Sequence, residues 1–187
     1  PDAELADLST LDADAQHRLW QYLVHGGPEN ALDFVNYAAD LIGYDCEWQE
    51  PRPLVRAGLH WPGAANTDLA RVQSNWVEGR PVAALVFYRA LVQSGNLWAV
   101  EAVIEGLATA GLNPLPVFVA SLKDPIAAAT LETLLADAPP AVIINATGFA
   151  VSAPGQDRTR GPFDCGGDDG GPVVLQMVFS GGNEEDW

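Results

Sequence analysis

Four basic side chains in the second half of the chain have the types and positions of an anion-binding site. After Pro81 the only lysines and arginines are Arg89, Lys123, Arg158 and Arg160. Each lies in a connection that leaves a predicted strand, and none lies on a predicted helix surface. Arginine and lysine bind carboxylates through charge-assisted hydrogen bonds, and arginine does so with two parallel donors. The pattern therefore predicts a rim that recognises an anion.

Neutral polar residues stand at the same strand ends. Tyr88 closes the first predicted strand, and Asn145 and Thr147 follow the third. A helix that begins at Asp124 would add the positive end of its dipole on this side. We expect these residues and the basic ones to contribute to substrate binding. The alternative is that Arg89 forms an internal ion pair with an acid such as Asp124.

Other chemistries lack their residue patterns. No glycine-rich loop ends in Gly-Lys-Ser/Thr, so the chain has no phosphate-binding loop of that kind. Ser94 and Ser121 are outside any Gly-x-Ser-x-Gly context. Cys46 and Cys165 are far apart, and the three histidines show no metal-ligand spacing. We expect no cofactor or metal in this chain, and catalytic residues cannot be named from it.

An alternation of apolar runs and helical patterns must position the candidate residues. The predicted strands and helices occupy residues 82–88, 97–110, 115–120, 125–136, 141–146 and 173–179. Nearly continuous apolar strands that alternate with helices are typical of a parallel sheet covered on both faces. The sequence therefore predicts an α/β domain with a four-stranded, mainly parallel sheet of Rossmann or flavodoxin-like type.

Pro116 suggests the strand order. A proline cannot donate a ladder hydrogen bond, so the second strand is expected at a sheet edge. The order 2-1-3-4 satisfies this condition. It also places a topological switch point between the first and third strands, where open α/β sheets bind ligands at the carboxyl ends of the strands.

The chain divides into three regions by pattern. Residues 1–43 predict a helical hairpin, because apolar residues recur at three and four positions on both sides of Gly26, Gly27 and Pro28. Residues 44–80 are broken by prolines and predict an irregular connector. Residues 81–187 form the predicted α/β domain.

Charge excludes one class of partner and suggests another. The formal net charge is −16 over 187 residues, which argues against nucleic acid, since phosphate contacts need clustered Lys and Arg. Residues 1–50 hold eleven acidic residues and one basic residue, Arg18. This surplus is either a solvated acidic face or a docking surface for a basic partner. Apolar runs are too short to cross a membrane, and the sparse cysteines fit a cytoplasmic protein.

Four segments carry a resemblance to a known family. They read VFYRALVQSGN at residues 86–96, GLNPLPVFVASLKDP at 111–125, PPAVIINATGFA at 139–150 and PVVLQMVFSGGNEEDW at 172–187. In this order they resemble the N-terminal part of the large subunits of aerobic cobaltochelatase, a family that includes the magnesium chelatase large subunit.

The resemblance implies a function for a longer protein of which this chain is a fragment. That protein would bind the corrin tetrapyrrole hydrogenobyrinic acid a,c-diamide for ATP-dependent Co²⁺ insertion in cobalamin biosynthesis. Two AAA+ type partner subunits would hydrolyse the nucleotide, so Co²⁺ and ATP-Mg²⁺ belong to the whole complex. The fragment alone is not expected to be active.

Three alternatives stay open. A magnesium chelatase fragment would bind protoporphyrin instead of the corrin. A non-catalytic module would dock the partner subunits. A free-standing protein of flavodoxin-like topology would bind a small ligand.

Overall fold

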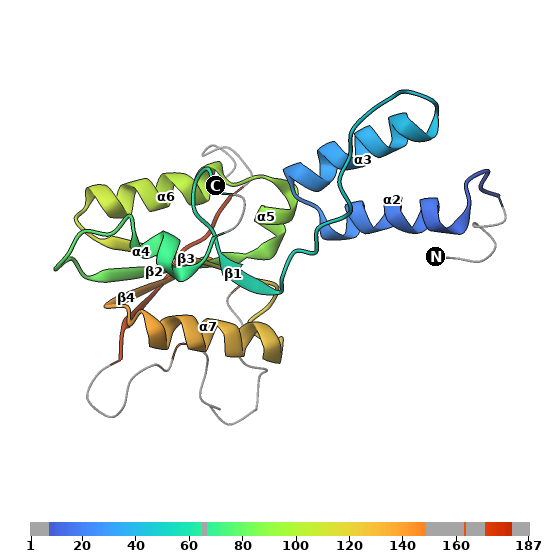
Figure 1. The fold of residues 1–187 in the computed structure, drawn as a ribbon. Coiled ribbons are helices and arrows are strands. Elements are labelled where there is room, and N and C mark those ends of the chain that lie inside the picture. The colour runs from blue at the N-terminus through green and yellow to red at the C-terminus, as the bar shows by residue number, and fades with distance from the viewer. Residues whose placement is uncertain (1–7, 65–66, 149–162, 164–170, 181–187) are drawn as a thin grey trace. The chain divides into compact units, whose positions relative to one another are not determined.

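The computed structural model describes residues 8–64, 67–148, 163 and 171–180. The chain forms two units, which we describe separately. The hairpin unit comprises residues 1–54 and 92–95, and the sheet unit comprises residues 55–91 and 96–187. The short helix α5 (Arg89–Ser94) has residues in both. Figure 1 shows the elements with their labels.

The sheet has five strands in the spatial order β1-β3-β2-β4-β5. Their bounds are β1 Ala57–Leu59, β2 Val82–Tyr88, β3 Asn113–Val119, β4 Val142–Asn145 and β5 Val173–Gln176. Strands β2 to β5 are parallel, whereas β1 runs antiparallel to β3. The predicted α/β class and the order of its four parallel strands are confirmed. The prediction of four strands was incomplete, because the segment before residue 81 supplies β1.

Helices cover both faces of this sheet. Figure 1 shows α6 (Trp98–Thr109) on one face and α7 (Pro125–Asp137) on the other. All seven residues of β3 and the five central residues of β2 are buried, as continuous apolar parallel strands require. The core under α7 joins side chains from the strands to Ala127, Leu131 and Leu135 of the helix.

Pro116 does not mark a sheet edge, which corrects the expectation from sequence. Its carbonyl accepts a hydrogen bond from His60 N at 3.1 Å. Since the N and C=O of one strand residue face the same side, the ring nitrogen of Pro116 faces β1 and not β2. Strand β1 ends at Leu59, which pairs with Val117, so the missing donor lies just beyond the last pair. The proline therefore limits the length of β1 without excluding it.

The segment between α4 (Leu69–Gln73) and β2 covers the rest of this side of β3. Trp76 Nε1 donates to Pro114 O at 2.8 Å. Asn113 accepts from Val77 N at 2.9 Å and donates to Val77 O at 3.0 Å, in the manner of a paired strand residue. Side chains thus satisfy the backbone where β1 is absent.

Two helices form the core of the hairpin unit, as predicted. Helix α2 (Ala13–His25) begins after Asp12, whose carboxylate accepts from Ala15 N at 2.8 Å. Gly26 ends it with φ of 65°, a conformation that favours glycine. Helix α3 (Pro28–Leu41) has its proline at the first helical position.

The amphipathic pattern of α3 is inverted. Its regularly spaced apolar residues face solvent, with exposed fractions of 62% for Leu32 and 60% for Val35. Its buried side chains are Asn30, Asp33 and Tyr37. At about 100° per residue these two sets lie on opposite sides of the helix. The apolar period predicted the helix correctly, but its packed face combines polar contacts with a small apolar cluster that includes Phe34 and Tyr37.

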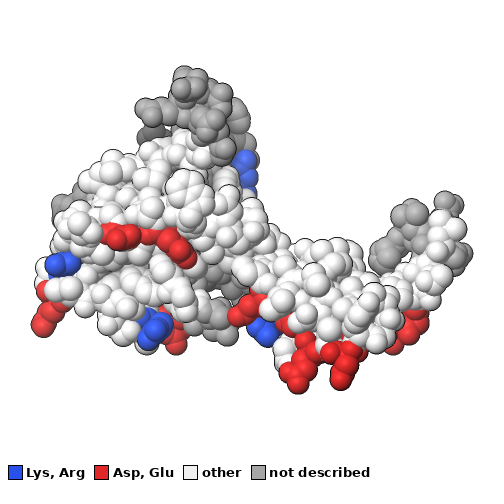
Figure 2. All heavy atoms as spheres, turned by 90° about the horizontal axis from the view of Figure 1, so that it is seen from above, with Lys and Arg blue, Asp and Glu red and all other residues white. Residues whose placement is uncertain are grey.

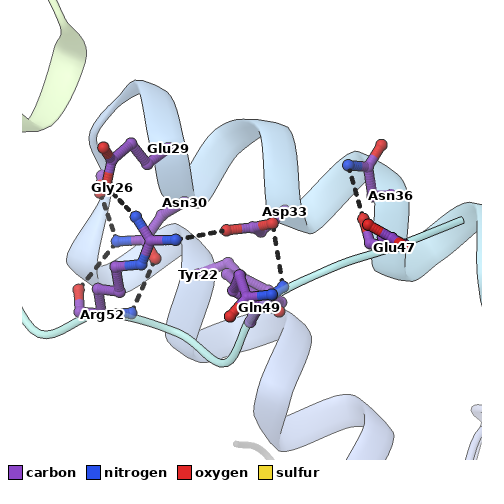
Figure 3. A network of polar contacts seen from close by, with 9 residues as sticks. All are labelled: Tyr22, Gly26, Glu29, Asn30, Asp33, Asn36, Glu47, Gln49 and Arg52. Carbon is purple, nitrogen blue, oxygen red and sulfur yellow. Dashed lines mark hydrogen bonds and ion pairs between the residues drawn. The ribbon is translucent and has the colours of Figure 1, made fainter.

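Those polar contacts join α3 to the extended segment 47–52 (Figure 3). Asn30 donates to Gly26 O at 2.7 Å and to Arg52 O at 2.9 Å, and it accepts from Arg52 N at 2.9 Å. Asp33 accepts from Gln49 N at 3.1 Å. The Tyr22 hydroxyl donates to Gln49 O, so α2 is tied to the same segment.

Asn30→Ala should open the hairpin unit much more easily than Leu32→Ala. The first change removes three hydrogen bonds of a buried side chain and leaves part-buried backbone groups of Arg52 and Gly26 without that partner, which costs about 2 kcal/mol, or about 30-fold in exchange protection. The second removes an exposed side chain and should change stability by less than about 0.5 kcal/mol. Amide hydrogen exchange of α3 measures both. Equal protection in the two variants would show that the polar network does not hold this unit.

Candidate functional site

The carboxyl ends of the four parallel strands meet along one edge of the sheet unit, which we call the carboxyl edge. Tyr88 and Arg89 stand at the end of β2, Lys123 follows β3, and Asn145 and Thr147 lie at the end of β4. The chain leaves β2 toward β3 and later returns past β2 to β4, so the switch point lies between β2 and β4. The predicted candidates among the described residues therefore share one edge. Arg158 and Arg160 lie outside the described residues.

Arg56 also lies at this edge and was missed from the sequence. Because β1 is antiparallel, its amino end meets the carboxyl end of β3, and Ala120 N donates to Arg56 O at 2.6 Å. Val119 pairs with Ala57 on one side and Tyr88 on the other. Arg56 precedes Ala57 and Arg89 follows Tyr88, so both arginines lie next to this row of paired residues, which we call the row.

A carboxylate on α7 binds Arg56. Asp124 Oδ2 accepts from the Arg56 guanidinium at 2.5 Å, with 61% of the arginine side chain and 16% of the aspartate side chain exposed. Asp124 Oδ1 caps α7 by accepting from Ile126 N at 2.9 Å and Ala127 N at 3.2 Å. The hydrogen bond from Arg56 is the main cause that lowers the pKa of Asp124, and the helix amides add to it. Asp124 therefore stays ionised at neutral pH.

The positive charge of Arg56 affects the pKa of Arg89. Burial lowers the pKa of its guanidinium, and the charge of Arg56 lowers it further. Like charges raise each other's free energy unless an anion lies close to both. The edge thus gathers two guanidinium groups whose charges act on one another.

Charge is segregated within the sheet unit. Among its described residues, three of the five Lys and Arg side chains lie at the carboxyl edge, with Asp124 as the one acid there. The other two, Arg71 and Arg80, share the unit with Asp68, Glu78, Glu101, Glu105, Glu132 and Asp137. The edge therefore carries +3 − 1 = +2, and the remaining described residues carry +2 − 6 = −4. A positive edge on an acidic unit favours the approach of anions.

Asn145 and Thr147 support the edge from within. They are 3% and 4% exposed. Asn145 Oδ1 accepts from Thr147 Oγ1 at 2.6 Å, and Asn145 Nδ2 donates to Gln176 Oε1 at 3.0 Å. Gln176 Nε2 donates to Thr147 O at 2.7 Å. The ends of β4 and β5 are thereby held together by side-chain amides.

The Tyr88 side chain links the ends of β2 and β4 at the switch point. Its hydroxyl accepts a hydrogen bond from Gly148 N at 2.8 Å, joining the end of β2 to the residue after Thr147. A Cβ on Gly148 would come within 2.9 Å of that hydroxyl. A larger residue at 148 would thus push the hydroxyl aside, and the contact leaves the exposed ring of Tyr88 available as an apolar surface at the edge.

His60 packs behind β1 against α6. Its Nε2 lies 3.2 Å from Glu101 Oε1, and its ring meets the Phe87 ring edge to face. Burial lowers the pKa of His60, and Glu101 opposes that shift. No group of three metal-ligating side chains occurs among the residues that the structure describes. Within the same residues, no helix is long and apolar enough to cross a membrane.

Mild acid should destabilise the chain through His60. Between pH 6.5 and the lower pKa of folded His60, the unfolded chain binds a proton that the folded chain does not, so stability falls as pH falls through this window. Above pH 6.5 the group contributes nothing. Urea unfolding at several pH values measures the free energy of unfolding. Between neutral pH and mild acid this free energy should fall less in His60→Gln than in the unchanged chain, and the exposed His17→Gln is the control. Identical pH slopes in all three proteins would rule this out.

A mainly parallel five-stranded sheet with helices on both faces defines the class of this protein as an α/β domain. The model of the family described as CobN/Magnesium Chelatase matches residues 20–187. This match and the relatives below show that the chain belongs to that family. The matched region begins at residue 20, well before the segments that carried the resemblance.

Relatives agree with this assignment. Aerobic cobaltochelatase subunits CobN from a Sinorhizobium species and from Pseudomonas aeruginosa are each 43% identical over all of this chain, which covers 15% of their length. The solved catalytic subunit of cobaltochelatase from Mycobacterium tuberculosis superposes with a TM-score of 0.65 at 25% identity. That similarity covers 95% of this chain and 14% of the solved one. The chain therefore spans about one seventh of the length of these relatives.

Proposed function

We propose that this chain is the part of a cobaltochelatase large subunit that helps to bind the tetrapyrrole. The ring would be hydrogenobyrinic acid a,c-diamide, and the whole protein would insert Co²⁺ into it with ATP hydrolysis during cobalamin biosynthesis. The observation that carries the proposal is the positive carboxyl edge of an otherwise acidic unit. Both CobN relatives are named as cobaltochelatase subunits, which supports cobalt as the metal.

The edge would bind the ring by its carboxylates. Arg89 and Lys123 would donate to carboxylate groups at the ring periphery, and arginine can engage both oxygens of one carboxylate. The exposed ring of Tyr88 would pack against the tetrapyrrole, while Asn145 and Thr147 position the strand ends. Arg158 and Arg160 stay proposed ligand-binding residues. Co²⁺ is a substrate in this scheme, and two AAA+ type partner subunits would hydrolyse ATP-Mg²⁺.

A titration tests this proposal. Tryptophan fluorescence of the chain should be quenched saturably by hydrogenobyrinic acid a,c-diamide. The double variant Arg89→Gln, Lys123→Gln should weaken binding by at least about tenfold, since each charged hydrogen bond contributes about 1.5 kcal/mol or more. Arg71→Gln, Arg80→Gln removes the same charge elsewhere and should bind almost normally. Equal weakening in both double variants would show that the net charge of the chain, and not the carboxyl edge, determines binding.

Ring preference distinguishes the two chelatase branches. Protoporphyrin has two carboxylates, so the edge should bind it more weakly than the corrin, which offers more. Competition between the two rings at constant ionic strength measures the difference. Stronger binding of protoporphyrin would favour a magnesium chelatase fragment.

The hairpin unit favours a second function, the docking of a partner subunit. Leu32 and Val35 expose an apolar face on α3, and Figure 2 shows acidic side chains gathered along one side of this unit. Its arginines, Arg18 and Arg52, already form ion pairs with acids of the same unit. Charge complementarity suggests a partner with an apolar contact surface bordered by Lys and Arg. We propose that an AAA+ type subunit supplies it.

Leu32→Ser combined with Val35→Ser should weaken that docking by at least about tenfold, because two exposed apolar side chains would lose their burial in the complex. Ile126→Ser, an equally exposed residue on α7, is the matched control. Sedimentation with each purified partner subunit measures the effect. Unchanged binding in the double variant would remove the hairpin face from the interface, whatever the ring titration shows.

A further inference from the structure

We propose that Arg56 is a ligand-binding residue of the carboxyl edge and that Asp124 is an internal carboxylate which occupies it until a ligand carboxylate takes its place. The inference rests on the proposed function for the class of ligand, a carboxylate. It adds to that function a residue that competes with the ligand and thereby sets its affinity.

Arg56 has a hydrogen-bonded backbone and a largely exposed side chain. Its carbonyl accepts from Ala120 N, which places the residue beside the end of β3. Most of its side chain is exposed, and Asp124 Oδ2 is its one carboxylate contact within the described part of the chain. A guanidinium has five N–H donors in a planar fork, and one carboxylate oxygen uses few of them. The remaining donors leave room for a second carboxylate.

The Asp124 carboxylate is held at the start of α7 by hydrogen bonds that do not involve Arg56. Its Oδ1 accepts from Ile126 N and Ala127 N at the start of that helix. These two bonds fix the position of the carboxylate on the helix, independently of Arg56. A ligand that engages Arg56 therefore competes with a stationary group of its own chemical type.

Arg89 makes the position suitable for an external anion. It follows Tyr88, which pairs with Val119, the same residue that pairs with Ala57 next to Arg56, and the two positive charges act on one another. A ligand carboxylate at the row would lower the free energy of both arginines at once.

The variant Asp124→Asn separates the two roles of this residue. Asparagine caps helices as well as aspartate does, so α7 should keep its start. The negative charge that faces Arg56 is removed. Affinity for carboxylates should rise, whereas loss of a ligand-binding residue would lower it.

Binding of citrate, a small tricarboxylate, and of hydrogenobyrinic acid a,c-diamide should be measured by calorimetry at constant ionic strength. Asp124→Asn should tighten binding of each by about fivefold, the scale of an exposed ion pair. Arg56→Gln should weaken it, and Asp124→Asn should have no further effect in the Arg56→Gln background. Asp137→Asn, at the other end of α7, removes the same charge away from the edge and serves as control. Unchanged unfolding temperature and circular dichroism in Asp124→Asn verify that the cap persists.

The outcomes separate this inference from the proposed function. Tightening by Asp124→Asn that depends on Arg56 supports the internal carboxylate. Equal tightening by Asp137→Asn, or tightening that survives Arg56→Gln, overturns it. A further outcome is that citrate binding responds to Asp124→Asn, Arg56→Gln and their combination as expected while the tetrapyrrole does not bind at all. That result supports the inference for carboxylates and contradicts the proposed ring function. Tetrapyrrole binding that does not respond to residue 124 overturns the inference alone, and no binding of either ligand overturns both.

Discussion

The pairing of β3 on both sides is the constraint on which the sheet unit depends. On one side β3 forms a seven-residue parallel ladder with β2, and on the other it accepts three antiparallel residues of β1. Two prolines, Pro114 and Pro116, direct their nitrogens away from β2, so the long ladder keeps its donors. This arrangement brings the start of β1 to the carboxyl edge, where a parallel strand would have brought its end.

Local charge at the edge differs in sign from the charge of the whole chain. A net charge of −16 would be expected to repel a polycarboxylate in solution. At contact distance the nearest groups dominate, since screening reduces the effect of charges more than about 10 Å away. The grouping of Arg56, Arg89 and Lys123 is therefore compatible with an acidic protein that recognises an acidic ligand.

Much of the fold could be predicted because its central strands are long and apolar. The run 82–88, the helix after Asp124 and the order around the switch point all follow from buried parallel strands and helix capping. Strand β1 could not be found, because three residues, Ala-Gly-Leu, show no periodicity. Arg56 was missed with it, since its place at the edge depends on that pairing. The exposed apolar face of α3 was equally hidden, because a period indicates a helix but not which side is covered.

The shortness of β1 links the edge to local opening of the sheet. A three-residue strand at the border is held by few hydrogen bonds, and such segments open at a lower free energy than the core they adjoin. Fraying of β1 would carry Arg56 away from Arg89 while β2, β3 and β4 stay paired. The number of guanidinium groups in the row thus depends on a local equilibrium that global unfolding does not report, and any molecule that bridges the two arginines would shift that equilibrium toward the closed strand.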